Sequence, residues 1–144
     1  MKSLTLDHHN RARILGLMTD QVWVVACLCA AWCGSCRDYR KAFDGLAASH
    51  PDKKFIWIDI EDQADVVGDI DVDNFPTLLI QRGDNVAFFG TVTPDPGIAE
   101  RVLAAQTCKS EAQLLADATA NPERRGWQEC NLRALLRQAG TGND

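Results

Sequence analysis

The amino-acid sequence predicts an α/β protein of three layers, with a central mixed sheet between two layers of helices. Apolar segments alternate with segments of helical spacing over most of the chain, as in parallel strands linked by helices. Two further strands joined by the turn signal Arg82-Gly83-Asp84 add an antiparallel hairpin. A chain of 144 residues is long enough to bury one core without covalent cross-links.

Each element before the tail follows from a local pattern. Asp7 is the predicted N-cap of the first helix, and Val22–Ala31 is apolar at nearly every position, as in a strand covered on both faces. Asp95-Pro96 opens the last of these helices. The predicted strands are 3–6, 22–31, 54–60, 77–81 and 85–90, and the predicted helices are 8–18, 33–50, 61–68 and 95–106.

The tail is predicted to be helical and to pack on the rest of the protein. Ser110-Glu111-Ala112-Gln113 is a capping-box pattern, and Asn121-Pro122 begins a second helix that carries Trp127 and Cys130. Because so short a segment cannot build its own core, we expect residues 1–107 to form the main domain and residues 108–144 to form an extension packed on it.

Composition excludes several classes of protein. The net charge is -5 and no block of basic residues occurs, so nucleic-acid binding is not expected. The longest apolar run, Val22 to Cys33, is too short to cross a bilayer, and no basic leader precedes it. We therefore expect a cytoplasmic protein without a membrane partner. In that compartment paired thiols serve catalysis or metal binding more often than structure.

The most informative segment is Trp32-Cys33-Gly34-Ser35-Cys36, which lies between a buried strand and the first turn of a helix. Amide N–H groups and the helix dipole favour negative charge there, so a thiol at this place ionises more readily. Cys33 should be exposed and Cys36 shielded. Cys33 can then attack a substrate disulfide, and Cys36 can displace the reduced product.

These residues resemble the thioredoxin family, as does Phe75-Pro76-Thr77 before the hairpin. The resemblance covers residues 3–107 and implies the thioredoxin fold, with Cys33 and Cys36 as the catalytic pair. It also implies a cis bond before Pro76 and a substrate groove. The groove residues would be Trp32, Gly34, Ser35, Phe75, Pro76, Thr77 and Gly90.

The sequence departs from the family at functionally important places. Ser35 stands where the family has proline between the cysteines, and Cys29 stands where it has a tryptophan. The family's buried aspartate and its lysine partner align with Cys27 and Trp57. The acid–base pair that would assist Cys36 is therefore missing, and resolution by Cys36 should be slow near neutral pH.

The other cysteines allow more than one interpretation. Cys27 and Cys29 share one face of a strand, where free cysteines pack as small apolar residues, although Cys27 could enter exchange as a third thiol. Four thiols between Cys27 and Cys36 also allow a zinc or iron–sulfur site, but their spacing on a strand does not favour one. Cys108 and Cys130 should be buried free thiols.

We therefore predict a thiol–disulfide oxidoreductase that acts on protein disulfides and is recycled by a reductase, without a cofactor or a metal ion. The alternative is a redox-sensing or protein-binding module of the same fold without efficient turnover.

Overall fold

The computed structural model describes residues 3–70, 72, 74–93 and 95–141. Its sheet has the strand order β1-β3-β2-β4-β5, in which β1, β3 and β2 are parallel and β4 and β5 run antiparallel to their neighbours. The strands are β1 (Leu4–Thr5), β2 (Trp23–Cys29), β3 (Lys54–Asp59), β4 (Thr77–Arg82) and β5 (Asn85–Thr91). The predicted α/β class with a mixed sheet is confirmed.

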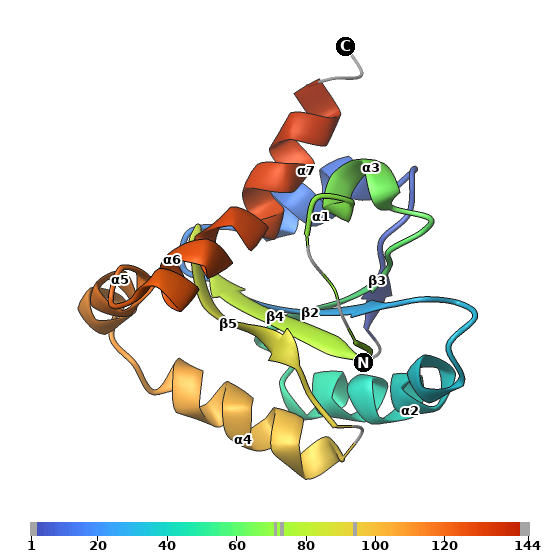
Figure 1. Ribbon diagram of the computed structural model, residues 1–144, viewed down its shortest axis with the longest axis horizontal. Coiled ribbons are helices and arrows are strands. Elements are labelled where there is room, and N and C mark those ends of the chain that lie inside the picture. The colour runs from blue at the N-terminus through green and yellow to red at the C-terminus, as the bar shows by residue number, and fades with distance from the viewer. Residues whose placement is uncertain (1–2, 71, 73, 94, 142–144) are drawn as a thin grey trace.

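Helices cover both faces of the sheet (Figure 1). On one face lie α2 (Gly34–Ser49) and α4 (Pro96–Thr107). On the other lie α1 (Arg11–Leu17), α3 (Ala64–Val67) and α7 (Leu132–Thr141). No helix in the described part of the chain is both long and apolar enough to cross a membrane.

Strand β2 is apolar throughout because both of its faces are buried. Alternate side chains of a strand point to opposite faces of the sheet. Val24, Ala26 and Leu28 pack with the α1, α3 and α7 layer, whereas Val25, Cys27 and Cys29 pack with the α2 and α4 layer. This alternation places the two strand cysteines on the side of the sheet that carries α2.

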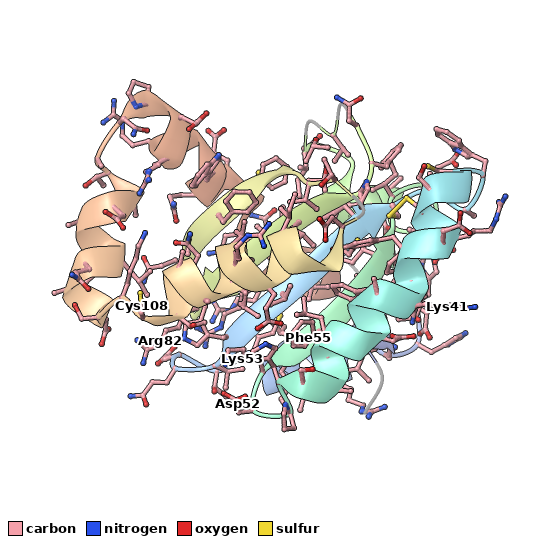
Figure 2. All side chains as sticks on the ribbon, turned by 90° about the horizontal axis from the view of Figure 1, so that it is seen from below. Lys41, Asp52, Lys53, Phe55, Arg82 and Cys108 are labelled. Atoms are coloured by element: carbon pink, nitrogen blue, oxygen red, sulfur yellow. A yellow bond between two sulfur atoms is a disulfide. The ribbon has the colours of Figure 1, made fainter. Side chains whose placement is uncertain are left out.

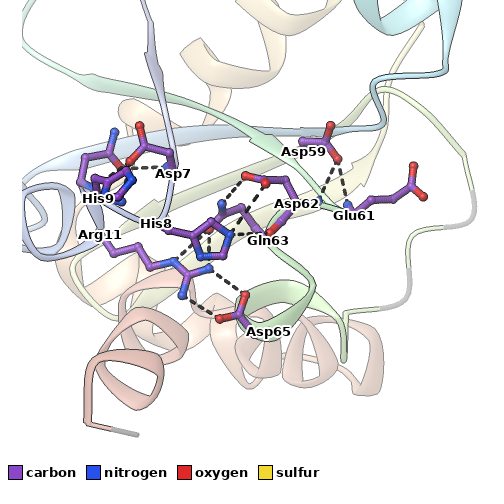
Figure 3. Close-up of polar contacts among 10 residues, drawn as sticks. Asp7, His8, His9, Arg11, Asp59, Glu61, Asp62, Gln63 and Asp65 are labelled. Carbon is purple, nitrogen blue, oxygen red and sulfur yellow. Dashed lines mark hydrogen bonds and ion pairs between the residues drawn. The ribbon is translucent and has the colours of Figure 1, made fainter. Parts of the chain in front are cut away.

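The start of α1 differs from the prediction. The N-cap residue is Asn10, and Asp7 lies one turn earlier. The Asp7 carboxylate accepts hydrogen bonds from the backbone N–H groups of His9 and Asn10, at 2.7 and 2.9 Å, and these bonds close a turn before the helix (Figure 3). The prediction failed because an aspartate can stabilise this turn by itself.

The predicted helix over 61–68 is also shorter in the structure. Asp59 Oδ1 accepts hydrogen bonds from the N–H groups of Glu61 and Asp62, so α3 follows a turn. Arg11 joins α1 to this region: its guanidinium donates to Gln63 Oε1 and to both carboxylate oxygens of Asp65, the latter at 2.7 Å (Figure 3).

The hairpin between β4 and β5 forms at the predicted position. Gly83 has a φ of 57°, in the left-handed region that glycine adopts without strain. The last helix before the tail begins at Asp95, whose side chain accepts a hydrogen bond from the Gly97 N–H, as expected of an N-cap.

The tail contains more elements than predicted. Helix α5 (Glu111–Ala118) has the predicted capping box at Ser110 and Gln113. The second helix is divided into α6 (Pro122–Trp127), a 3₁₀ turn (Gln128–Cys130) and α7. Asn131 interrupts it, because its backbone is not helical and its side chain accepts a hydrogen bond from the Ala134 N–H at the start of α7.

Buried amide groups connect the tail to the sheet. Gln81 of β4 is fully buried: its Oε1 accepts a hydrogen bond from the Leu132 N–H at 2.8 Å, and its Nε2 donates to Asn131 Oδ1 at 2.9 Å. Gln128 bonds both the N–H and the C=O of Val86 on the edge strand β5. The tail helices therefore pack on the sheet, whereas the division at 107/108 stays a prediction.

Candidate active site

The candidate active site lies where β2 ends and α2 begins. Cys33 is the N-cap residue of α2, its backbone is extended, and its N–H donates to the Ala30 carbonyl at 3.0 Å. Arg37, one turn into the helix, donates to the Ala31 carbonyl at 2.9 Å. These contacts hold a short loop from the strand to the helix, and Cys33 lies at the end of that loop.

Cys29 and Cys36 form a disulfide bond, which Figure 2 shows as the yellow bond near the start of α2. Their Cα atoms are 5.8 Å apart, within the usual range for disulfides, and each residue is only 1% exposed. Cys33 is a free, partly exposed cysteine. The structure therefore joins Cys36 to the strand cysteine and not to its neighbour in the motif.

The sequence had suggested Cys27 and not Cys29 as the third thiol, and the structure differs at this point. Cys29 is the last residue of β2, opposite the first turn of α2, whereas Cys27 lies two residues further back, about 6.6 Å along the strand. Cys27 is a free, buried cysteine whose Sγ lies 3.7 Å from Cys29 Sγ. The alignment of Cys29 with a family tryptophan, four residues before the first cysteine of the motif, was the signal that could have identified it.

Two residues of the predicted groove, Trp32 and Phe75, contact each other. The Trp32 side chain is 66% exposed and contacts the Phe75 ring edge-on, with centroids 5.6 Å apart. Cys33 and Phe75 both pack against the cluster that contains Cys29 and Cys36. The site thus combines one accessible thiol with an exposed aromatic surface.

The Phe75–Pro76 peptide bond is cis, and Pro76 is buried. The Thr77 hydroxyl donates to the Asn74 carbonyl at 2.7 Å, and the Pro76 carbonyl accepts from the Val92 N–H at 3.0 Å. These bonds fix the loop at the start of β4.

The remaining residues of the predicted groove lie on β5 and at the start of α2. Gly90 of β5 faces Leu78 in the β4 ladder, next to the Thr77–Thr91 pair. Gly34 and Ser35 are exposed in the first turn of α2.

The site has no carboxylate where the family has its buried acid. Cys27 and Trp57 face each other in the β2–β3 register. Burial raises the pKa of the Cys27 thiol well above its ordinary value, so Cys27 stays protonated at neutral pH. The Arg40 guanidinium lies 4.8 Å from the centre of the Trp57 ring and donates to Thr5 Oγ1. Sequence reasoning did not find Arg40, because only the fold brings it to Trp57.

The other cysteines lie apart from this site. Cys108 is exposed at the end of α4, which corrects the expectation that it is buried, and its thiol donates to the Ala105 carbonyl of the same helix. Cys130 is partly buried against the opposite face of the sheet. Within the described ranges, no group of three or more His, Cys, Asp or Glu residues is arranged to hold a metal ion.

Known proteins are similar in sequence and in fold. The family model for thioredoxin matches residues 6–102. The chain is 27% identical over 106 residues to a Streptomyces coelicolor protein named "Putative thioredoxin 2", and the match covers 74% of this chain and 78% of that one.

Two solved structures share the fold. Thioredoxin from Trypanosoma brucei brucei has a TM-score of 0.62 at 21% identity, covering 74% of this chain and 92% of its own. A complex of ferredoxin:thioredoxin reductase with thioredoxin f2 contains a chain with a TM-score of 0.62 at 18% identity, covering 72% and 94%.

The family match, the order of strands and helices around the mixed sheet, and the cysteines at the start of α2 agree with one another. Membership and the Cys29–Cys36 disulfide indicate thiol–disulfide oxidoreductase chemistry in general. The chain belongs to the thioredoxin family.

Proposed function

We propose that this protein reduces protein disulfides, with Cys33 as the nucleophile and Cys36 as the thiol that resolves the mixed disulfide. One observation carries the proposal: of the two motif cysteines, only Cys33 is accessible, and it lies at the N-terminus of a long helix beside exposed Trp32. Cys36 lies one turn further on and is buried. An accessible thiol can meet a substrate, and a buried neighbour can complete the exchange.

The reaction transfers two electrons to the substrate. The Cys33 thiolate attacks one sulfur of a substrate disulfide, forms a mixed disulfide and releases the first substrate thiolate. The Cys36 thiolate then attacks Cys33 Sγ and releases the second substrate thiolate. Both released thiolates take up the protons that Cys33 and Cys36 gave up, so the substrate gains two thiols and the protein one disulfide.

The loop around Pro76 is the proposed docking surface for an extended substrate segment. Backbone groups of Phe75 would pair with the segment as an added strand does, and Trp32, Thr77 and Gly90 would border it. The exposed Gly34 and Ser35 leave room for the substrate near Cys33.

A reductase and a reducing compartment complete the proposal. Repeated turnover requires that the protein disulfide be reduced again. The neighbour of the same fold bound to ferredoxin:thioredoxin reductase supports a partner of this kind. We also keep the prediction that the protein works in the cytoplasm, which cell fractionation followed by immunodetection would test.

The variant Cys36→Ser tests the assignment of roles. It should accumulate a covalent complex with an oxidised protein substrate such as insulin, linked through Cys33, because the mixed disulfide forms but its resolution is lost. Cys33→Ser should form no such complex. A substrate peptide linked to any cysteine other than Cys33 would show that the roles are assigned wrongly.

The alternative, a redox-sensing or protein-binding module, has one observation in its favour. Cys27 and Trp57 occupy the places of the family's acid–base pair, so the carboxylate of that pair is not there to assist Cys36. Such a module would capture partners but would not turn over, and catalytic turnover therefore distinguishes the two functions.

A further inference from the structure

Cys36 has two potential disulfide partners. Cys33 precedes it by three residues in the first turn of α2, and Cys29 lies across from it at the end of β2. The backbone of the strand and helix brings the Cα atoms of Cys29 and Cys36 to 5.8 Å. Cys36 thus has one possible partner on the neighbouring strand and one at the start of its own helix.

The two partners differ in exposure. Cys29 is 1% exposed, whereas Cys33 is only partly buried. A disulfide between Cys29 and Cys36 is therefore hidden from other proteins, and one that includes Cys33 has an accessible sulfur.

Cys27 is not an equivalent candidate for this exchange. It shares its face of β2 with Cys29, and their sulfurs are 3.7 Å apart, but it is a free cysteine two residues back from the end of the strand. The Cys27 side chain contacts the Cys29 side chain on the same face of the strand. Cys27 and Cys29 are therefore a matched pair: equally buried on one strand face, with only Cys29 joined to Cys36.

We propose that Cys29 is a second resolving cysteine, which forms a disulfide with Cys36 after substrate reduction and leaves Cys33 as a free thiol. This inference rests on the proposed function, and it adds a step after it. The Cys29 sulfur attacks Cys36 Sγ of the Cys33–Cys36 disulfide, the Cys29–Cys36 bond forms, and the Cys33–Cys36 bond breaks. Cys33 leaves as a thiolate and takes up the proton that Cys29 loses. No further oxidant or reductant is needed, because one disulfide replaces another.

The step has two consequences for the reaction. The released substrate thiols cannot reverse the reaction directly, because the Cys33 Sγ that they would attack is no longer part of a disulfide. Recycling must begin at Cys33, which attacks Cys36 and regenerates the accessible disulfide before a reductant can act. The buried disulfide thus stores the oxidised state.

The position of the disulfide can be mapped directly in the unmodified protein. Reduced protein is mixed with excess insulin, quenched in acid and alkylated with N-ethylmaleimide. It is then digested with trypsin and chymotrypsin without reduction. Cleavage after Leu28, Trp32 and Arg37 separates the peptide Cys29–Trp32 from the peptide Cys33–Arg37. Mass spectrometry with fragmentation then locates the disulfide and the alkylated cysteine.

We expect the peptides Cys29–Trp32 and Cys33–Arg37 to be cross-linked through Cys36, with the alkyl group on Cys33. A disulfide within Cys33–Arg37, with alkylated Cys29, would overturn the inference and leave the proposed function intact. If insulin oxidises none of these cysteines, the proposed function fails. A parallel oxidation with diamide then decides the pairing of Cys29 independently.

The matched variants sharpen the result. Cys29→Ser should move the disulfide to Cys33–Cys36, and its reduction by glutathione should be several-fold faster than in the parent. Cys27→Ser should keep the Cys29–Cys36 disulfide and the parent rate. If Cys29→Ser and the parent are reduced at equal rates, the oxidised state is not stored in a buried disulfide, and the inference is wrong.

Discussion

The two faces of the sheet are built from different chemistry. The face covered by α2 and α4 contains four cysteines and several aromatic rings, and few buried polar side chains fix it. The face covered by α1, α3 and α7 contains mainly aliphatic side chains, and buried glutamines at 63 and 81 bond it to its helices.

Because of this difference, the reactive sulfur atoms lie on one face of the sheet and the rigid, hydrogen-bonded amides lie on the other. Sulfur atoms on the first face can exchange covalent partners without leaving an unpaired polar group behind. Amides on the second face cannot move without losing buried hydrogen bonds, each loss costing about 1–3 kcal/mol. The tail completes the rigid face, and the exchange site lies on the other.

Removal of the tail should have the largest effect on stability, because the tail covers part of the face that carries α1, α3 and α7. Deletion of residues 109–144 exposes the core around Leu132 and Leu136, and burial of each such leucine contributes about 1.5–3 kcal/mol. We expect a loss of at least ~3 kcal/mol in the free energy of unfolding, measured by chemical denaturation. An unchanged midpoint would mean that the tail is a separable unit.

A pair of leucine substitutions in the full-length chain provides a finer test. Leu136→Ala should cost about 2–5 kcal/mol, since Leu136 is buried. Leu115→Ala, on the exposed side of α5, should stay within about 0.5 kcal/mol of the parent. Equal effects of the two changes would contradict the described packing of the tail.

A carboxylate at position 27 should make the resolving step faster on the face that carries the cysteines. In Cys27→Asp, the new side chain occupies the place of the family's buried acid and can take a proton from Cys36. We expect single-turnover release of reduced product to become on the order of 10²-fold faster at neutral pH, the lower range of general-base assistance. The parent rate should rise through the alkaline range, since desolvation disfavours a buried thiolate.

Stability must be measured on the same variant, because a buried carboxylate without a hydrogen-bond partner destabilises the fold. If folded Cys27→Asp resolves no faster, and the parent rate shows no alkaline rise, the missing acid–base pair does not limit the resolving step.

The buried amide at the junction of sheet and tail gives an intermediate effect. Gln81→Leu leaves the Leu132 N–H without its acceptor, and the expected cost is about 1–3 kcal/mol in thermal or chemical unfolding. Gln138→Leu is the control, because Gln138 is exposed on α7. A Gln81 variant as stable as this control would mean that the amide contributes nothing to the junction.

The ion pair between Arg11 and Asp65 should give the smallest effect. The hydrogen bond from Arg11 lowers the pKa of Asp65, but the Asp65 side chain is more than half exposed, so Asp65→Asn should cost less than ~1 kcal/mol. Because the folded pKa is lower than the unfolded one, the contribution is complete above about pH 4 and is lost as the pH falls through the folded value.

The melting-temperature difference between Asp65→Asn and the parent should therefore shrink between pH 7 and pH 3. The corresponding difference for Asp69→Asn, an exposed carboxylate after α3, should be small at both pH values. A difference at Asp65 that does not shrink in acid would show that the effect is not electrostatic.

Local patterns predicted most of the fold. The continuous apolar character of β2, the hairpin at Gly83 and the caps at Asp95 and Ser110 each depend on neighbouring residues, so the sequence contains the information. The division of the last helix at Asn131 was missed, because it depends on contacts with β4 and with the turn after it, which are distant in the sequence.

The site was predictable only in part for the same reason. Cys33 and Cys36 follow from their position at a helix start, and both remain the proposed catalytic pair. The choice between Cys27 and Cys29 depends on where the strand ends relative to α2. The two residues lie on the same face of the strand, two positions apart, and the alternation of side chains does not tell which of them lies opposite the helix. Arg40 reaches Trp57 only across two elements of the folded chain.

Turnover in insulin reduction is the most direct test of the central claim that this is an oxidoreductase. With dithiothreitol as reductant, the parent should reduce many equivalents of insulin, Cys33→Ser should stay at the uncatalysed rate, and Cys27→Ser should match the parent. A parent protein that stays at the uncatalysed rate, while Cys36→Ser still captures insulin through Cys33, would contradict the claim and identify a binding or sensing module.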